Sequence, residues 1–121
     1  MSGVVEINPV EVEKSIQGLV QQIAKGVRVV SEAHKAKLDA DRIYDHAFAV
    51  AYVTADGPQT EKKYVAEKQT QQERMNRDAA EVAYQHAQRQ MKALEGQLSA
   101  WQTIAKSVTS MYSAAGSGRG Q

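Results

Sequence analysis

Residues 80–112 read AEVAYQHAQRQMKALEGQLSAWQTIAKSVTSMY, and their seam-forming side chains recur at alternating spacings of four and three residues. This heptad period places them in one stripe along a helix, where they face a partner helix over the whole length. Packing of helix on helix therefore organises the fold, rather than a sheet or a pocket. The stripe consists of Ala80, Tyr84, Ala87, Met91, Leu94, Leu98, Trp101, Ala105, Val108 and Tyr112.

The first half of the chain carries a matching stripe with the same alternation of spacings. Two such stripes, separated by one short turn, predict an antiparallel pair of helices. The expected members of the first stripe are Ile16, Val20, Ile23, Val27, Val30, His34, Lys37, Asp41, Tyr44, Phe48 and Ala51.

Prolines and glycines divide the chain. Asn8-Pro9 has the composition of a helix N-cap followed by a first-turn proline, and Asp56-Gly57-Pro58 has that of a helix stop. The glycine-rich end of the chain has no apolar periodicity and is expected to be disordered. The predicted organisation is a flexible segment 1–8, a helix over about 9–54, a turn over 55–60, a helix over about 60–113 and a disordered tail over 114–121.

The expected fold is all-α: a long antiparallel two-helix hairpin, in effect a coiled coil, centred on the turn. Pairing about that turn should place Ile16 near Leu98 and Val30 near Tyr84. One buried stripe per helix is rarely enough to offset chain entropy, so two hairpins are expected to dimerise into a four-helix bundle. The predicted oligomer interface comprises Ile43, Ala47, Val50, Met75, Val82, Ile104 and Met111.

The expected stripe turns polar at three consecutive positions of the first helix, His34, Lys37 and Asp41. The same pairing rule places Glu73 within reach of Lys37, and Arg77 within reach of Asp41. Buried charges seldom add net stability, but an unpaired one is costly, so this polar seam layer is interpreted as a control on register. A metal or proton-transfer site is the alternative interpretation, which the adjacent lysine and arginine partners disfavour.

Composition narrows the function classes. The chain has 121 residues, a net charge of +1 and no cysteine, which disfavours thiol chemistry and a strongly basic nucleic-acid coat. No apolar run approaches the roughly 20 residues of a spanning helix, and no catalytic, phosphate-binding or metal motif is recognisable. We therefore expect a cytoplasmic, non-enzymatic protein without cofactor, metal, membrane or small-molecule substrate.

Nucleic-acid binding is an alternative, because lysine and arginine are frequent from the turn to the middle of the second helix. Glutamate and aspartate are interspersed in the same stretch, which is also typical of a solvated helix face. The candidate contacts are Lys62, Lys63, Lys68, Arg74, Arg89 and Lys92.

The stretches AYQHAQRQMKALE (residues 83–95) and LSAWQTI (residues 98–104) resemble small helical proteins of tailed bacteriophages that are encoded among recombination and replication functions. The resemblance covers about residues 60–113 and implies a phage context, in the host-cell cytoplasm, without implying catalytic residues. With the helical pattern, it favours an interaction protein that binds itself and another protein, as an accessory in DNA metabolism or a modulator of a host protein. A nucleic-acid-binding helical protein and a virion or assembly component are the alternatives.

Overall fold

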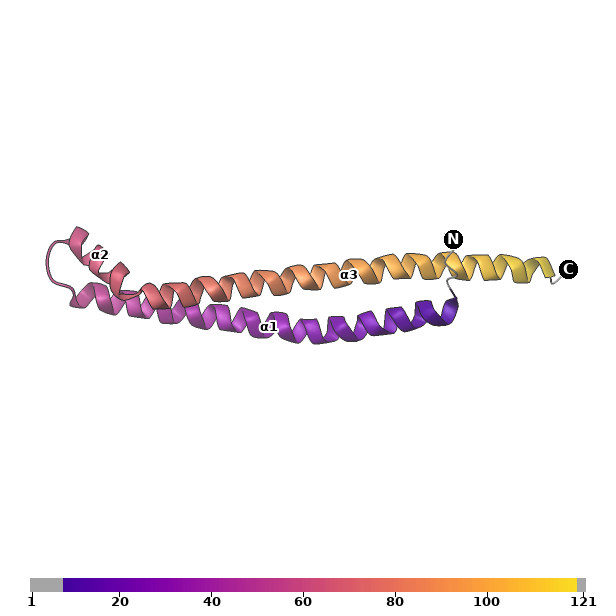
Figure 1. Cartoon of the computed structure of the whole chain (residues 1–121), viewed down its shortest axis with the longest axis horizontal. Coiled ribbons are helices and arrows are strands. Elements are labelled where there is room, and N and C mark those ends of the chain that lie inside the picture. The colour runs from indigo at the N-terminus through magenta and orange to yellow at the C-terminus, as the bar shows by residue number, and fades with distance from the viewer. Residues whose placement is uncertain (1–7, 120–121) are drawn as a thin grey trace, which may run out of the picture. The chain divides into compact units, whose positions relative to one another are not determined.

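The computed structural model describes residues 8–119, with side chains as far as residue 114, and all regular structure in that range is helical. The predicted all-α class is therefore confirmed. The elements are α1 (Pro9–Thr54), α2 (Gln59–Gln69) and α3 (Gln71–Arg119) (Figure 1). The expected flexible segment falls outside the described residues except for Asn8. The second helix does not stop near residue 113, because α3 continues to Arg119 through most of the expected disordered tail.

Both ends of the first helix follow from local chemistry. The Asn8 side chain caps α1, since its Oδ1 accepts a hydrogen bond of 2.9 Å from the Glu11 N–H. The turn after Thr54 passes through Gly57, whose φ of +102° is a conformation that residues with a Cβ rarely adopt. Pro58 then sits in extended backbone immediately before α2. These bounds of α1 coincide with the range 9–54 expected from the sequence.

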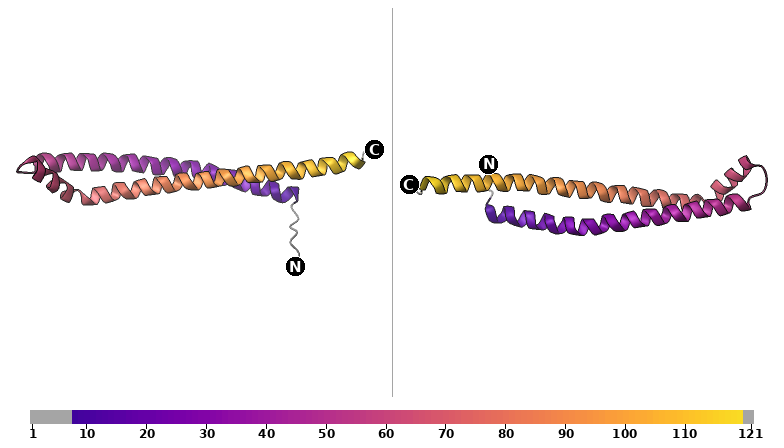
Figure 2. Two further views of the ribbon diagram at one scale, coloured as in Figure 1. Left: turned by 90° about the horizontal axis from the view of Figure 1, so that it is seen from above. Right: turned by 180° about the vertical axis from the view of Figure 1, so that it is seen from behind.

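The second predicted helix is divided at Thr70, and α2 runs at an angle to the start of α3 (Figures 1 and 2). Thr70 has a non-helical φ of −107° and ψ of 20°, and only 3% of it is exposed. Its N–H and its Oγ1 both donate to the Ala66 carbonyl, at 3.1 and 2.7 Å. A threonine hydroxyl that bonds the carbonyl four residues earlier often accompanies a bend, although Thr103 makes the same bond to Ser99 without interrupting α3. No proline or glycine marks the division at Thr70.

The described residues form two compact units. The middle unit, Arg28–Arg89, contains the end of α1, the turn, α2 and the start of α3. In it α1 and α3 run antiparallel, since His34 stacks on Tyr84 while Lys37 lies beside Glu81. Tyr84 therefore packs one helical turn further along α1 than Val30, the predicted neighbour. The angled course of α2 explains the shift, because the second arm uses extra residues before α3 pairs with α1.

The terminal unit contains the described residues up to Val27 and those from Gln90 onward. Val12 and Leu19 are its buried apolar residues, and Ile16 lines a groove together with Ala105 and Val108. The predicted neighbour of Ile16 was Leu98, so the register here is also displaced toward higher numbers on α3.

The buried stripe of α1 differs from the expected one at Val20, Val27 and His34, which are exposed, whereas the expected members Asp41 and Phe48 are half-buried. Val20 and Val27 are 51% and 59% exposed, whereas Leu19 is buried and Gly26 faces Met91. Ser15, Gly18, Asp39, Asp41, Phe48 and Tyr52 are half-buried beside a central stripe of at least half-buried residues. That stripe comprises Val12, Ile16, Leu19, Ile23, Gly26, Val30, Ala33, Lys37, Ala40, Tyr44, Ala47 and Ala51. This is again an exact alternation of four and three. The sequence pattern favours valines as core residues because they are more hydrophobic than glycine and alanine. In the structure the helices approach closely, and this favours the smaller side chains.

Three glycines inside the helices provide a test of this packing. A Cβ at Gly26 would lie 2.8 Å from Met91 Cε, whereas at Gly18 and Gly96 nothing lies within 4 Å of the added atom. Gly18→Ala and Gly96→Ala should each raise the free energy of unfolding by about 0.5–1 kcal/mol through helix propensity. Gly26→Ala should give a smaller gain, because the Met91 side chain must move.

Urea unfolding followed by circular dichroism measures these differences. An equal gain at all three positions would show that α1 and α3 do not approach closely at Gly26.

Candidate functional site

The polar seam layer lies in the middle unit and is organised around Lys37. Its Nζ lies 3.0 Å from Asp41 Oδ2, one turn along the same helix, and 3.9 Å from Glu81 Oε1 on α3. The hydrogen bond to Asp41 raises the pKa of Lys37 above its ordinary value of 10.5; desolvation opposes this, while the negative charges of Asp41 and Glu81 add to it. Lys37 is thus held as an ammonium ion between two carboxylates, at a position where a heptad would normally carry an apolar side chain.

Aromatic rings cover the other members of the layer. The His34 imidazole stacks on Tyr84 with 4.8 Å between the ring centroids, and the Arg77 guanidinium lies 4.4 Å from the Tyr44 ring centroid. The second contact is a cation–π interaction, which holds the arginine charge against an apolar neighbour. Arg77 Nη2 also reaches Asp78 Oδ1 at 3.3 Å.

The predicted partners within this layer are wrong. Among residues 8–114, no ion pair joins Lys37 to Glu73 or Asp41 to Arg77. Because the register is displaced, Lys37 meets Glu81 in place of Glu73, and Arg77 meets the Tyr44 ring in place of the Asp41 carboxylate. Lys37 is thus balanced by Asp41 of its own helix and by Glu81 of α3, while Arg77 lies over the Tyr44 ring and beside Asp78.

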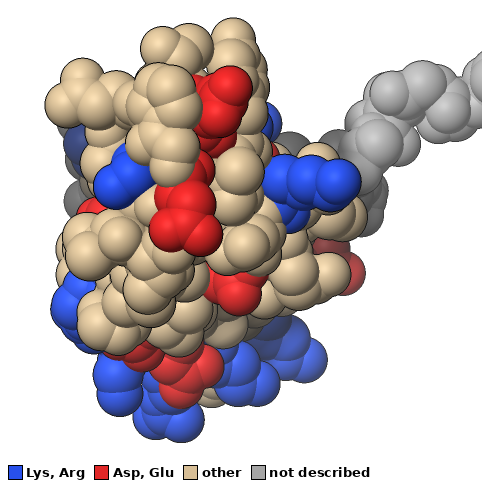
Figure 3. All heavy atoms as spheres, turned by 90° about the vertical axis from the view of Figure 1, so that its left-hand side faces the viewer, with Lys and Arg blue, Asp and Glu red and all other residues tan. Residues whose placement is uncertain are grey.

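The predicted nucleic-acid contacts are divided between the two units. Lys63, Lys68 and Arg74 are exposed, and Lys62 is half-buried with its Nζ 6.0 Å from the Tyr52 ring centroid. Basic and acidic side chains are intermingled at the end of the middle unit that carries α2 (Figure 3). Arg89 lies at the far end of the same unit on α3, while Lys92 belongs to the terminal unit.

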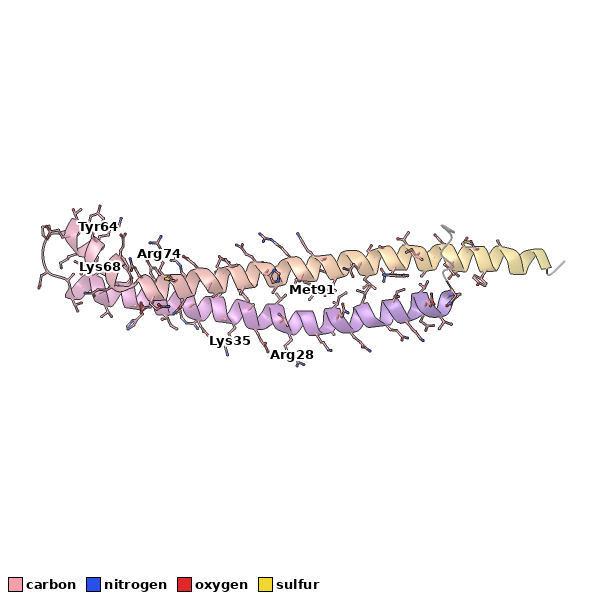
Figure 4. The ribbon with its side chains drawn as sticks, viewed as in Figure 1. Arg28, Lys35, Tyr64, Lys68, Arg74 and Met91 are labelled. Atoms are coloured by element: carbon pink, nitrogen blue, oxygen red, sulfur yellow. The ribbon has the colours of Figure 1, made fainter. Side chains whose placement is uncertain are left out.

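Tyr64 is a residue whose exposure the sequence pattern did not indicate. Its side chain is 65% exposed. Figure 4 shows it on the outer side of α2, on the same side as Lys68 and Arg74. The signal that could have revealed this is the lack of other apolar residues around it, since Glu61, Lys63 and Lys68 surround it in sequence.

The predicted oligomer residues divide into separate groups. Ile43 and Val50 of α1 are exposed, one flank away from the buried stripe, and Met75 and Val82 are exposed on the side of α3 opposite its stripe. Ala47 is itself a half-buried member of the α1 stripe. In the terminal unit, Ile104 is half-buried and Met111 is exposed.

A basic row on α1 was also missed. Arg28 and Lys35 are exposed, stand seven residues apart and point away from α3 (Figure 4). Arg42 continues the row and is paired with Asp39 of its own helix. A heptad spacing opposite the buried stripe was the available signal, and it is equally typical of a solvated outer face.

Comparison with known proteins assigns no function to these surfaces. No protein-family model, curated protein or solved structure matches the chain.

Two further features are absent from the residues that the structure describes. No helix among them combines the length and apolarity required to cross a bilayer. Within the same range, no three His, Cys, Asp or Glu side chains converge as a candidate metal-ion site.

The Lys37 contacts predict a pH-dependent contribution to stability. Because the pKa of Lys37 is raised in the folded state, its ion pairs stabilise the fold fully below pH 10.5, and the contribution is lost as pH rises through the folded-state value. Lys37→Met should therefore unfold more easily than the wild type at neutral pH, and the difference should shrink in alkaline buffer. Thermal unfolding at a series of pH values measures it.

Asp41→Asn serves as the matched variant, because it removes the carboxylate nearest to Lys37. In an Asp41→Asn background, Lys37→Met should cause a smaller loss of stability at neutral pH than it does in the wild type. A deficit of Lys37→Met that is unchanged at alkaline pH would indicate that the lysine stem, and not its charge, contributes the stability.

Proposed function

We propose that this chain is a non-enzymatic interaction protein: a long antiparallel helical hairpin that pairs with a second copy into a four-helix bundle and acts by binding another macromolecule. The proposed setting is the cytoplasm of a phage-infected cell. There the protein is an accessory in phage DNA metabolism or a modulator of a host protein, and binding is its entire chemistry.

The observation that carries this proposal is the thin core. Among the described residues the buried apolar side chains are few and no large one is fully buried. So thin a core is typical of a pair of helices that gains further burial from a partner. The buried apolar residues are Val12, Leu19, Ala51, Ala66 and Ala87.

Three features support the hairpin. The buried residues of α1 and α3 keep one heptad phase along each helix. The contacts of His34 with Tyr84 and of Lys37 with Glu81 have antiparallel order in the middle unit. The glycine at positive φ in the turn is typical of a chain reversal.

The choice between DNA metabolism and modulation of a host protein is guided by the bacteriophage resemblance of residues 83–104. A nucleic-acid-binding function is the second candidate, and the exposed Tyr64 beside Lys68 favours it, because an exposed ring next to a cation can stack on an unpaired base. A virion or assembly component is the third, which would grow without limit instead of closing as a dimer.

Light scattering combined with affinity capture tests the proposal. The chain should elute as a particle of twice its 13.3 kDa mass over a wide range of concentrations. The tagged dimer should also retain one stoichiometric protein from host lysate after nuclease treatment.

Other outcomes have defined meanings. Recovery of nucleic acid alone, lost with added salt, would replace the proposal with the nucleic-acid-binding function. Mass that increases continuously with concentration would replace it with an assembly component. If the chain is a monomer at every concentration, the proposed four-helix bundle is wrong.

A further inference from the structure

The two sides of the α1–α3 pair in the middle unit differ in charge. On one side His34, Lys37 and Tyr44 of α1 contact Tyr84, Glu81 and Arg77 of α3. These contacts show which edge of α1 and which edge of α3 meet on that side of the pair. Heptad geometry then gives the two helix edges that meet on the opposite side. All the ion-pair and cation–π contacts that join α1 to α3 in this unit lie on the first side.

The opposite side has few charges. Its α1 flank is small or aliphatic, whereas on its α3 flank two alanines lie between the polar residues Gln72, Asn76 and His86. On α1, the residues of this side recur every seven positions, from Val29 to Val50. On α3, they recur at spacings of three and four, and they include Ala79 and Ala83. Glu32 and Asp39 lie at its outer α1 edge, where Asp39 is paired with Arg42. We call this side the uncharged face and define it by Val29, Ala36, Ile43, Val50, Ala79 and Ala83, all of which are exposed.

The composition of the uncharged face suits a second copy of the same chain. A two-fold interface brings one face against itself, so a face with charges would oppose like charges unless they were arranged to complement each other. Here Val29, Ile43 and Val50 are 52%, 59% and 48% exposed and would enter the interface. Ala79 and Ala83 present only methyl groups, which lets another helix approach closely. The face is also continuous with the buried stripe, as the flanks of a four-helix bundle are.

We propose that the uncharged face of the middle unit is the surface on which two copies of this chain associate. The inference rests on the proposed function, since it names the face that the four-helix bundle uses. Met75 and Val82 lie on the side of α3 opposite its stripe and stay outside this interface, although their exposed apolar side chains would suggest the reverse.

Two neighbouring residues of α3 make a matched test. Ala83 lies on the uncharged face and Val82 does not, yet both are exposed positions in one helix. Ala83→Glu should weaken dimerisation by about tenfold or more, because a carboxylate would be desolvated without a partner. Val82→Glu should change the dissociation constant by less than about threefold. Analytical ultracentrifugation measures both, and circular dichroism should show equal helicity.

Cysteine labelling provides a measurement that does not disturb the interface. The chain contains no cysteine, so a single introduced thiol reports on one position. Ala83→Cys should react with a maleimide more slowly than Val82→Cys when the protein is dimeric, and the two rates should converge on dilution below the dissociation constant.

The possible failures of the two proposals are distinguishable. A dimeric wild type in which Val82→Glu dissociates and Ala83→Glu does not would overturn the face while leaving self-association intact. A dimer that tolerates Ala83→Glu but no longer captures its lysate protein would assign the face to that protein, which also overturns the inference. A wild type that is monomeric at every concentration would remove the bundle and this face together.

Discussion

The arrangement depends on how closely α1 and α3 can approach one another. Along α1 one of the two alternating positions of the buried stripe becomes small after Leu19, with Gly26, Ala33, Ala40 and Ala47 at intervals of seven residues. Larger neighbours then fill the space from the other helix, as Met91 does against Gly26. Small residues opposite large ones give dense packing at a short distance between helices. They also leave little apolar area per residue, which is why the core is thin.

The polar layer follows from the same constraint. Where the stripe is made of alanines, a long side chain such as Lys37 can lie along the interface and place its ammonium group between carboxylates near the solvent. The Arg77 guanidinium is likewise accommodated at the interface, where it lies against the Tyr44 ring. The contacts of Lys37 with Glu81 and of Arg77 with Tyr44 join the two helices, so a pair of helices that slid by one turn would lose both.

Much of this architecture can be predicted from the sequence, and the failures have identifiable causes. The α3 stripe is at least half-buried from Ala80 to Val108 as its spacing predicts, although Tyr112 is exposed. On α1 the valines at 20 and 27 were preferred over their neighbours because hydrophobicity is visible in a sequence, while distance between helices is not. The pairing of Lys37 was missed because Thr70, a residue that permits helix, divides the second arm and shifts the register.

Thr70 also separates two properties that usually change together in a helix, its direction and its phase. Ala66, Thr70, Glu73 and Arg77 are all at least half-buried, so the heptad continues across the bend. The Thr70 hydroxyl bonds a carbonyl within this stretch, and the bend therefore leaves that backbone group satisfied. The backbone therefore changes direction at Thr70, while the buried side chains before and after it keep one heptad phase.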